Sequence, residues 1–203
     1  MTWVKVCGIR EMSALQAAFE AGADAVGFVI APGSPREVDL ATATELHSRS
    51  PLPTFLVSVD LGVDEALGAL DTTGADGIQP HGMSQIEVAA MALELGRNVL
   101  LPIPVADDGP TAEPNSVPPG AIPLFDTKAL QAHGGTGMVF DWNLVAGIDR
   151  EFVLAGGLGV DNVAQAIRAV RPFGVDASSR LEVAPGVKDP DTIRTFVRKA
   201  KQA

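Results

Sequence analysis

The 203-residue chain carries a formal net charge of −10, with 46% hydrophobic and 20% charged residues, a composition typical of a folded globular protein. The negative charge excludes a broad nucleic-acid-binding surface, although a few backbone N–H groups and one arginine can still hold a small anion. There is no apolar run of about 18 residues and no cationic leader, and the single cysteine cannot form an internal disulfide, so we expect a cytoplasmic protein without membrane contact.

Short apolar runs rich in β-branched residues alternate with longer amphipathic stretches along the chain. Strands are predicted at residues 3–8, 24–30, 53–59, 76–79, 98–103, 121–125, 151–155 and 173–177. Helices are predicted at 11–21, 38–49, 64–72, 84–95, 142–147, 160–170 and 190–201. Eight strands joined by right-handed crossovers predict an α/β protein, a single (β/α)8 TIM barrel that spans residues 1–203 as one domain.

One unit departs from this alternation. The segment 106–120, ADDGPTAEPNSVPPG, contains four prolines and no helical periodicity. Proline lacks the N–H that a helix interior needs, so the fifth helix is predicted to be shortened or missing.

Several polar residues follow the predicted strands. In such a barrel the carboxyl ends of the strands hold the active site, so we expect these side chains to meet there. The set comprises Cys7, Arg36, Gln79, His81, Asp126, Ser178 and Ser179. Four of them leave an alternative open. Arg36 is equally compatible with a surface ion pair, His81 with a solvated loop histidine, Cys7 with an inert buried thiol, and Asp126 with a residue that caps a helix or turn.

The alternation of side chains along the first strand points Lys5 and Cys7 to one face and Val4 and Val6 to the other. The valine face suits the surrounding helices, which places Lys5 and Cys7 inside the barrel. A lysine there needs a carboxylate partner, for which Asp176 is the candidate, and its charge is expected to lower the thiol pKa.

Glycine-rich segments predict a phosphate site. Bare backbone N–H groups after the seventh and eighth strands form the recurrent anion site of this fold. The expected contributors are Gly134, Gly135, Gly156, Gly157, Ser178, Ser179 and Arg180. For Arg180 a side chain that faces solvent is favoured over one that reaches the phosphate.

The motifs VKVCGIR, GADAVGFVIAPGSPREV, GIQPHG, PLFDT, GGTGMVFDW, LAGGLGVDNV and GVDASSRLE resemble, in order and along nearly the whole chain, those of phosphoribosylanthranilate isomerases. The resemblance implies an isomerase of tryptophan biosynthesis that performs the Amadori rearrangement of N-(5-phosphoribosyl)anthranilate to 1-(2-carboxyphenylamino)-1-deoxyribulose 5-phosphate. It implies that Asp126 is the general acid, that Cys7 is the general base, and that Arg36 pairs with the anthranilate carboxylate. No metal or cofactor is implied.

The remaining substrate-binding candidates are Lys5, Gln79, His81 and Asp176. Pro80, Asp60 and Arg180 depart from the family pattern. Two other functions stay open: a sugar-phosphate-binding barrel without turnover, and a dual-substrate isomerase that also accepts an aminoaldose, against which Cys7 argues because such enzymes carry an aspartate there.

Overall fold

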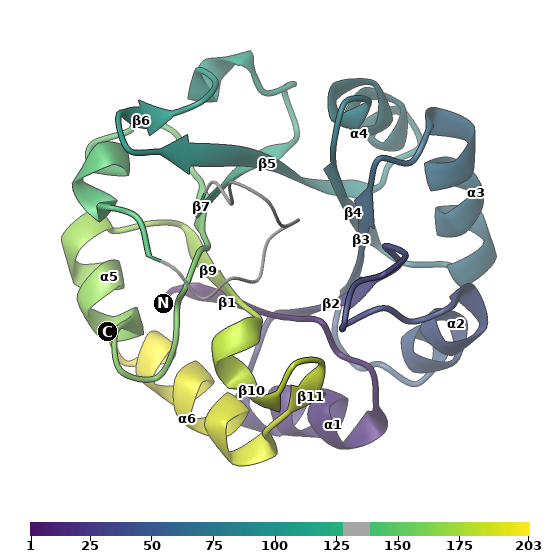
Figure 1. The fold of residues 1–203 in the computed structure, drawn as a ribbon, viewed down its shortest axis with the longest axis horizontal. Coiled ribbons are helices and arrows are strands. Elements are labelled where there is room, and N and C mark those ends of the chain that lie inside the picture. Colours follow the sequence, from purple (N-terminus) through teal and green to yellow (C-terminus); the bar gives the residue numbers. More distant parts are fainter. Residues whose placement is uncertain (128–138) are drawn as a thin grey trace.

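A computed structural model of the chain describes residues 1–127 and 139–203. Within these ranges eight parallel strands close into a barrel (Figure 1). The barrel strands are β1 (Trp3–Cys7), β2 (Ala25–Val29), β3 (Thr54–Val59), β4 (Gly77–His81), β5 (Asn98–Ala106), β7 (Ile122–Thr127), β8 (Val153–Leu154) and β9 (Gly174–Ala177). Pairing of β9 with β1 and of β4 with β5 completes the closure, which confirms the predicted (β/α)8 barrel.

Six α-helices in the described part of the chain surround the barrel (Figure 1). They are α1 (Met12–Ala21), α2 (Leu40–Ser48), α3 (Val63–Thr73), α4 (Gln85–Glu94), α5 (Val163–Val170) and α6 (Pro190–Lys201). The last of them shows why the periodic segments fold this way. In α6, Ile193, Phe196, Val197 and Ala200 recur at helical spacing and are all buried, while Asp189 caps the helix and Pro190 occupies its first turn. None of the helices in the described ranges is long and apolar enough to cross a membrane.

The irregular unit after β5 contains no α-helix, as its prolines predicted. Strand β6 (Gly109–Pro110) folds back antiparallel on the end of β5, and a 3-10 turn, η1 (Pro114–Ser116), follows. The predicted helix at 142–147, by contrast, is wrong. Only the 3-10 turn η2 (Trp142–Val145) forms there, and the backbone becomes extended at Ala146.

A short hairpin after β9 was not predicted. The 3-10 turn η3 (Ser179–Leu181) leads into β10 (Glu182–Ala184), which pairs antiparallel with β11 (Val187–Lys188). The hairpin forms a separate two-stranded sheet, and α6 follows it directly in the chain. It becomes important for the site because of the charges that it carries.

The two faces of the barrel strands pack as the alternation predicted. Val4 and Val6 belong to the main core cluster, which lies between the barrel strands and the surrounding helices. A second cluster, which includes Phe55, Leu100 and Leu124, fills the amino end of the barrel interior. At the carboxyl end, where the polar residues gather, the strands and the loops that follow them enclose a cavity.

Candidate active site

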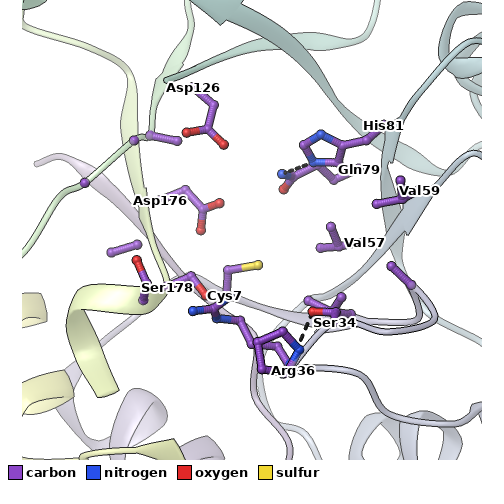
Figure 2. A pocket seen from close by; sticks show the side chains of 18 of the residues that line it. Cys7, Ser34, Arg36, Val57, Val59, Gln79, His81, Asp126, Asp176 and Ser178 are labelled. Carbon is purple, nitrogen blue, oxygen red and sulfur yellow. Dashed lines mark hydrogen bonds between the residues drawn. The ribbon is translucent and has the colours of Figure 1, made fainter. Parts of the chain in front are cut away.

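A cavity of about 480 Å³ opens at the carboxyl ends of the strands (Figure 2). Its walls hold most of the residues that the sequence singled out. These are Cys7, Arg36, Gln79, His81, Asp126, Gly156, Gly157, Asp176, Ser178 and Ser179. Gly134 and Gly135 lie outside the described residues. Lys5 is absent from the walls because it is buried beneath them.

Lys5 links two sides of the barrel. Its ammonium donates to Asp176 Oδ2 and to Gln79 Oε1, both at 2.9 Å, which confirms the carboxylate partner expected from the sequence. Burial opposes the Lys5 charge, but the attraction of Asp176 and Cys7 outweighs it, so the Lys5 pKa is raised. Lys5 therefore stays charged and orients two cavity residues from below.

Cys7 ends β1 with its thiol in the cavity (Figure 2). Space for it exists because Gly27 faces it on β2: a Cβ there would lie 3.0 Å from the sulfur and 3.1 Å from Lys5 Cε. Burial raises the pKa of the thiol, and the charge of Lys5 lowers it by less. The Lys5 charge therefore acts in the direction expected from the sequence, but burial outweighs it, so the net pKa of the thiol is raised and the expected thiolate is not favoured.

Asp126 is the penultimate residue of β7 and also lines the cavity. One carboxyl oxygen, Oδ1, accepts a hydrogen bond from the Thr127 N–H at 2.8 Å. Burial, with a further contribution from the negative charge of Asp176, raises the pKa of Asp126 from its ordinary 3.8 to about 6. A carboxyl group with that pKa keeps its proton on about a tenth of the molecules at pH 7, enough to act as an acid.

His81 belongs to the last position of β4 rather than to a solvated loop. Gln79 Nε2 and His81 Nε2 lie 3.1 Å apart, so the amide that binds Lys5 also contacts the imidazole. The strand keeps its parallel register with β3 through Pro80, which pairs with Ser58. Pro80 therefore does not displace this part of the site.

Arg36 forms an ion pair, but a sheltered one. Its Nε and Nη2 donate to the two carboxylate oxygens of Glu182 at 2.7 and 2.9 Å, and its side chain is only 11% exposed. Glu182 lies on β10, and Lys188 of β11 binds the same carboxylate. Sequence reasoning missed both residues, although Glu182 ends the final motif of the resemblance, and the two charges on either side of the Pro185-Gly186 turn were the available signal.

The backbone of the loop after β8 requires glycine at two positions. Gly156 and Gly157 both have positive φ, of 84° and 62°, and a side chain on Gly156 would overlap Thr127. Arg180 does not line the cavity. Its guanidinium donates to Gly157 O at 3.0 Å and to Asp161 Oδ2 at 2.8 Å, so the side chain braces this loop instead of extending into solvent as favoured.

No group of three or more His, Cys, Asp or Glu side chains that could hold a metal ion occurs in residues 1–127 and 139–203. The chemistry available to the cavity is that of a buried thiol, a carboxyl group that titrates near pH 6, and flanking cationic and backbone N–H groups.

Comparison with known proteins gives a consistent result. The family model for N-(5'-phosphoribosyl)anthranilate (PRA) isomerase matches residues 4–199. A protein of that name from Rhodopseudomonas palustris (strain BisB18) is 41% identical over 98% of this chain and 95% of its own length. The Thermotoga maritima phosphoribosyl anthranilate isomerase structure shares 34% identity, with a TM-score of 0.88 and full coverage of both chains. A phosphoribosyl anthranilate isomerase bound to reduced 1-(o-carboxyphenylamino)-1-deoxyribulose 5-phosphate superposes with a TM-score of 0.83 at 31% identity, again with full coverage of both chains.

Proposed function

The chain belongs to the N-(5'-phosphoribosyl)anthranilate isomerase family, an isomerase family of tryptophan biosynthesis, and from that premise we propose that Cys7 and Asp126 catalyse its Amadori rearrangement. In this proposal the whole chain acts as one cytoplasmic domain on a small phosphorylated substrate. The observation that carries it is the placement of a buried thiol and a carboxyl group with a raised pKa in the walls of one cavity (Figure 2).

Asp126 supplies the first proton. In its protonated form the carboxyl group donates to the ribose ring oxygen while the bond between that oxygen and C1′ breaks. The lone pair of the anthranilate nitrogen forms the C1′=N bond, so the opened sugar becomes an iminium ion. The raised pKa of Asp126 supports this role, because a carboxyl group at its ordinary pKa of 3.8 would be almost fully ionised near neutral pH.

Cys7 takes the second proton. The iminium group makes the C2′–H bond acidic, and the thiolate removes that proton while the electron pair moves into a C1′=C2′ bond and neutralises the nitrogen. The resulting enol then becomes the C2′ ketone as its hydroxyl group loses a proton to water and C1′ gains a proton from water. Burial raises the pKa of the thiol, so Cys7 begins protonated. The positive charge of the iminium ion then favours ionisation of the thiol, whose proton passes to water.

The two ends of the substrate have separate partners. Arg36 meets the anthranilate carboxylate, while Gly156, Gly157, Ser178 and Ser179 offer backbone N–H groups to the phosphate. Between them, Asp176 Oδ1 is buried and has no hydrogen-bond partner among the described residues, which suits a ribose hydroxyl.

The proposal is tested by turnover of freshly prepared N-(5'-phosphoribosyl)anthranilate. Turnover is measured as the loss of substrate fluorescence, and NMR identifies the ketose product. We expect turnover by the wild-type chain without added metal. Binding without turnover would show a sugar-phosphate-binding barrel instead, and comparable turnover of the histidine-pathway aminoaldose would show a dual-substrate enzyme. Either result would overturn the proposal as stated.

A further inference from the structure

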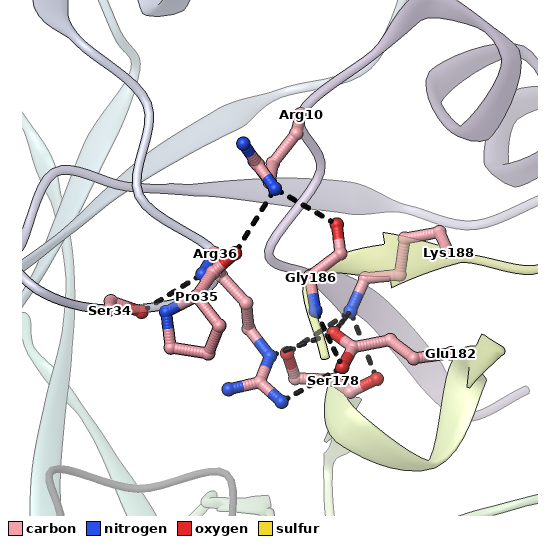
Figure 3. A network of polar contacts seen from close by, with 8 residues as sticks. All are labelled: Arg10, Ser34, Pro35, Arg36, Ser178, Glu182, Gly186 and Lys188. Carbon is pink, nitrogen blue, oxygen red and sulfur yellow. Dashed lines mark hydrogen bonds and ion pairs between the residues drawn. The ribbon is translucent and has the colours of Figure 1, made fainter. Parts of the chain in front are cut away.

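Glu182, a buried carboxylate outside the proposed acid–base pair, binds the guanidinium of Arg36 at one end of the cavity (Figure 3). Glu182 Oε1 accepts from Arg36 Nε and from Lys188 Nζ, each at 2.7 Å. Its other oxygen, Oε2, accepts from Arg36 Nη2 at 2.9 Å and from the Gly186 N–H at 3.2 Å. The Glu182 side chain is 4% exposed, so solvent screens these contacts little.

The hairpin that carries Glu182 is fixed against the segment that carries Arg36. Arg10 Nη1 donates to Pro35 O at 3.1 Å and to Gly186 O at 3.4 Å, which ties the two chain segments together (Figure 3). Gly186 has a φ of +79°, and any side chain on it would overlap the Pro35 carbonyl. Glu182 therefore contacts Arg36 from an element whose position is set by close backbone packing.

The geometry of the ion pair leaves a defined edge of the guanidinium for another anion. A guanidinium carries five N–H donors in one plane, and Glu182 occupies two of them along the Nε–Nη2 edge. Arg36 Nη1 has no hydrogen-bond partner among the described residues, and Arg36 lines the cavity. Because the bidentate contact fixes the plane, the Nη1–Nη2 edge has one orientation in which to meet a second carboxylate.

The charges around Glu182 keep that edge attractive. Glu182 alone would neutralise Arg36, but Lys188, 1% exposed, adds a second positive charge to the same carboxylate. Burial opposes ionisation of Glu182, yet its hydrogen bonds from Arg36 and Lys188 outweigh this and lower its pKa. The three side chains together carry one net positive charge, so a substrate anion is still drawn to Arg36.

We infer that Glu182 is a positioning residue that aims Arg36 at the carboxylate of the aromatic substrate, with Lys188 preserving the positive charge. The inference rests on the proposed function, in which Arg36 meets that carboxylate. Glu182 touches no reacting atom, and it acts only through the orientation of Arg36.

The test is Glu182→Gln, which keeps the size of the side chain and removes its charge, beside the control Glu94→Gln, an exposed glutamate at the end of α4. Because a charge-assisted bidentate contact is replaced by a weaker one, we expect KM to rise about tenfold while kcat changes by less than about threefold. Glu94→Gln should leave both values unchanged. A fall in kcat with an unchanged KM would contradict the inference.

A second measurement separates positioning from general loosening of the site. Calorimetry compares two stable ligands, the reduced product analogue with its carboxyl group and an anilino analogue without it. Glu182→Gln should weaken the first by about tenfold and leave the second unchanged, because only the first engages Arg36. Equal weakening of both would overturn the inference, as would no weakening of either.

Folding and function are controlled separately. If Glu182→Gln does not fold by circular dichroism, the double variant Glu182→Gln/Lys188→Met removes an anion and a cation together, and the same difference between the two ligands is expected. A wild-type chain that binds both analogues but does not turn over the substrate would refute the proposed function. The ligand comparison would still decide the role of Glu182.

Discussion

Substitution of Asp126 by asparagine should make the protein more stable while it removes activity. The folded state raises the Asp126 pKa from 3.8 to about 6, so the buried carboxylate is unfavourable once it is ionised. The loss of folding free energy caused by this carboxylate is absent below pH 3.8. It grows at 1.36 kcal/mol per pH unit as pH rises toward 6 and is constant above that. Asparagine resembles the protonated carboxyl group and can still accept from the Thr127 N–H, so the variant should gain up to about 3 kcal/mol at pH 8.

Urea unfolding at several pH values measures this gain. At pH 8 the midpoint should rise with an unchanged m-value, and at pH 5 the gain should fall to about half, because the wild-type carboxyl group is then mostly protonated when folded. Asp149→Asn, at an exposed position before β8, provides the control and should show no comparable gain. A destabilised Asp126→Asn, or a gain that does not change with pH, would refute the claim that burial raises the pKa of this carboxyl group.

Four further outcomes follow from the site. The value of kcat/KM, plotted against pH, should rise up to about pH 6 and then stay level until the thiol ionises. Asp126→Asn should lose the break near pH 6. A break that survives in this variant would come from the substrate phosphate instead. Cys7→Ala should lose about 10² to 10⁴ in kcat with an unchanged circular dichroism spectrum, and near-normal turnover would exclude Cys7 as the base. Arg180→Gly should change KM by less than about twofold because Arg180 binds Gly157 O and Asp161, whereas a large rise in KM with a shallower salt dependence would place it on the phosphate. Turnover should persist in EDTA, since the proposed acid and base are side chains of the protein, and an activity lost to EDTA and restored by a divalent cation would contradict this.

Local sequence patterns predicted the barrel and one ion pair inside it, that of Lys5 with Asp176. The alternation in WVKVC placed Lys5 and Cys7 on the inner face, and the same alternation on the eighth strand of the barrel placed Asp176 there, so their pairing could be predicted. The prolines of 106–120 likewise showed where a helix could not form.

What could not be predicted depends on contacts distant in sequence and on burial. Glu182 meets Arg36 across 146 residues, and the hairpin that carries it is too short to give a periodic signal. The direction of the Cys7 pKa depends on how far water is excluded from the thiol relative to the charge of Lys5, which sequence proximity does not show. Arg180 was expected in solvent because long arginine side chains usually keep their charged ends in water. Its contact with Asp161, on another loop, could not be read from the sequence.

Single-turnover rates with substrate carrying hydrogen or deuterium at C2′ test the central claim most directly, for the wild-type chain, Cys7→Ala and Asp126→Asn side by side. If Cys7 removes the C2′ proton and Asp126 opens the ring, Cys7→Ala should be slow with a full primary isotope effect. Asp126→Asn should be slow with almost none, because ring opening then limits the rate. An isotope effect that is the same in both variants, or a Cys7→Ala variant as fast as the wild type, would contradict the assignment of these two residues.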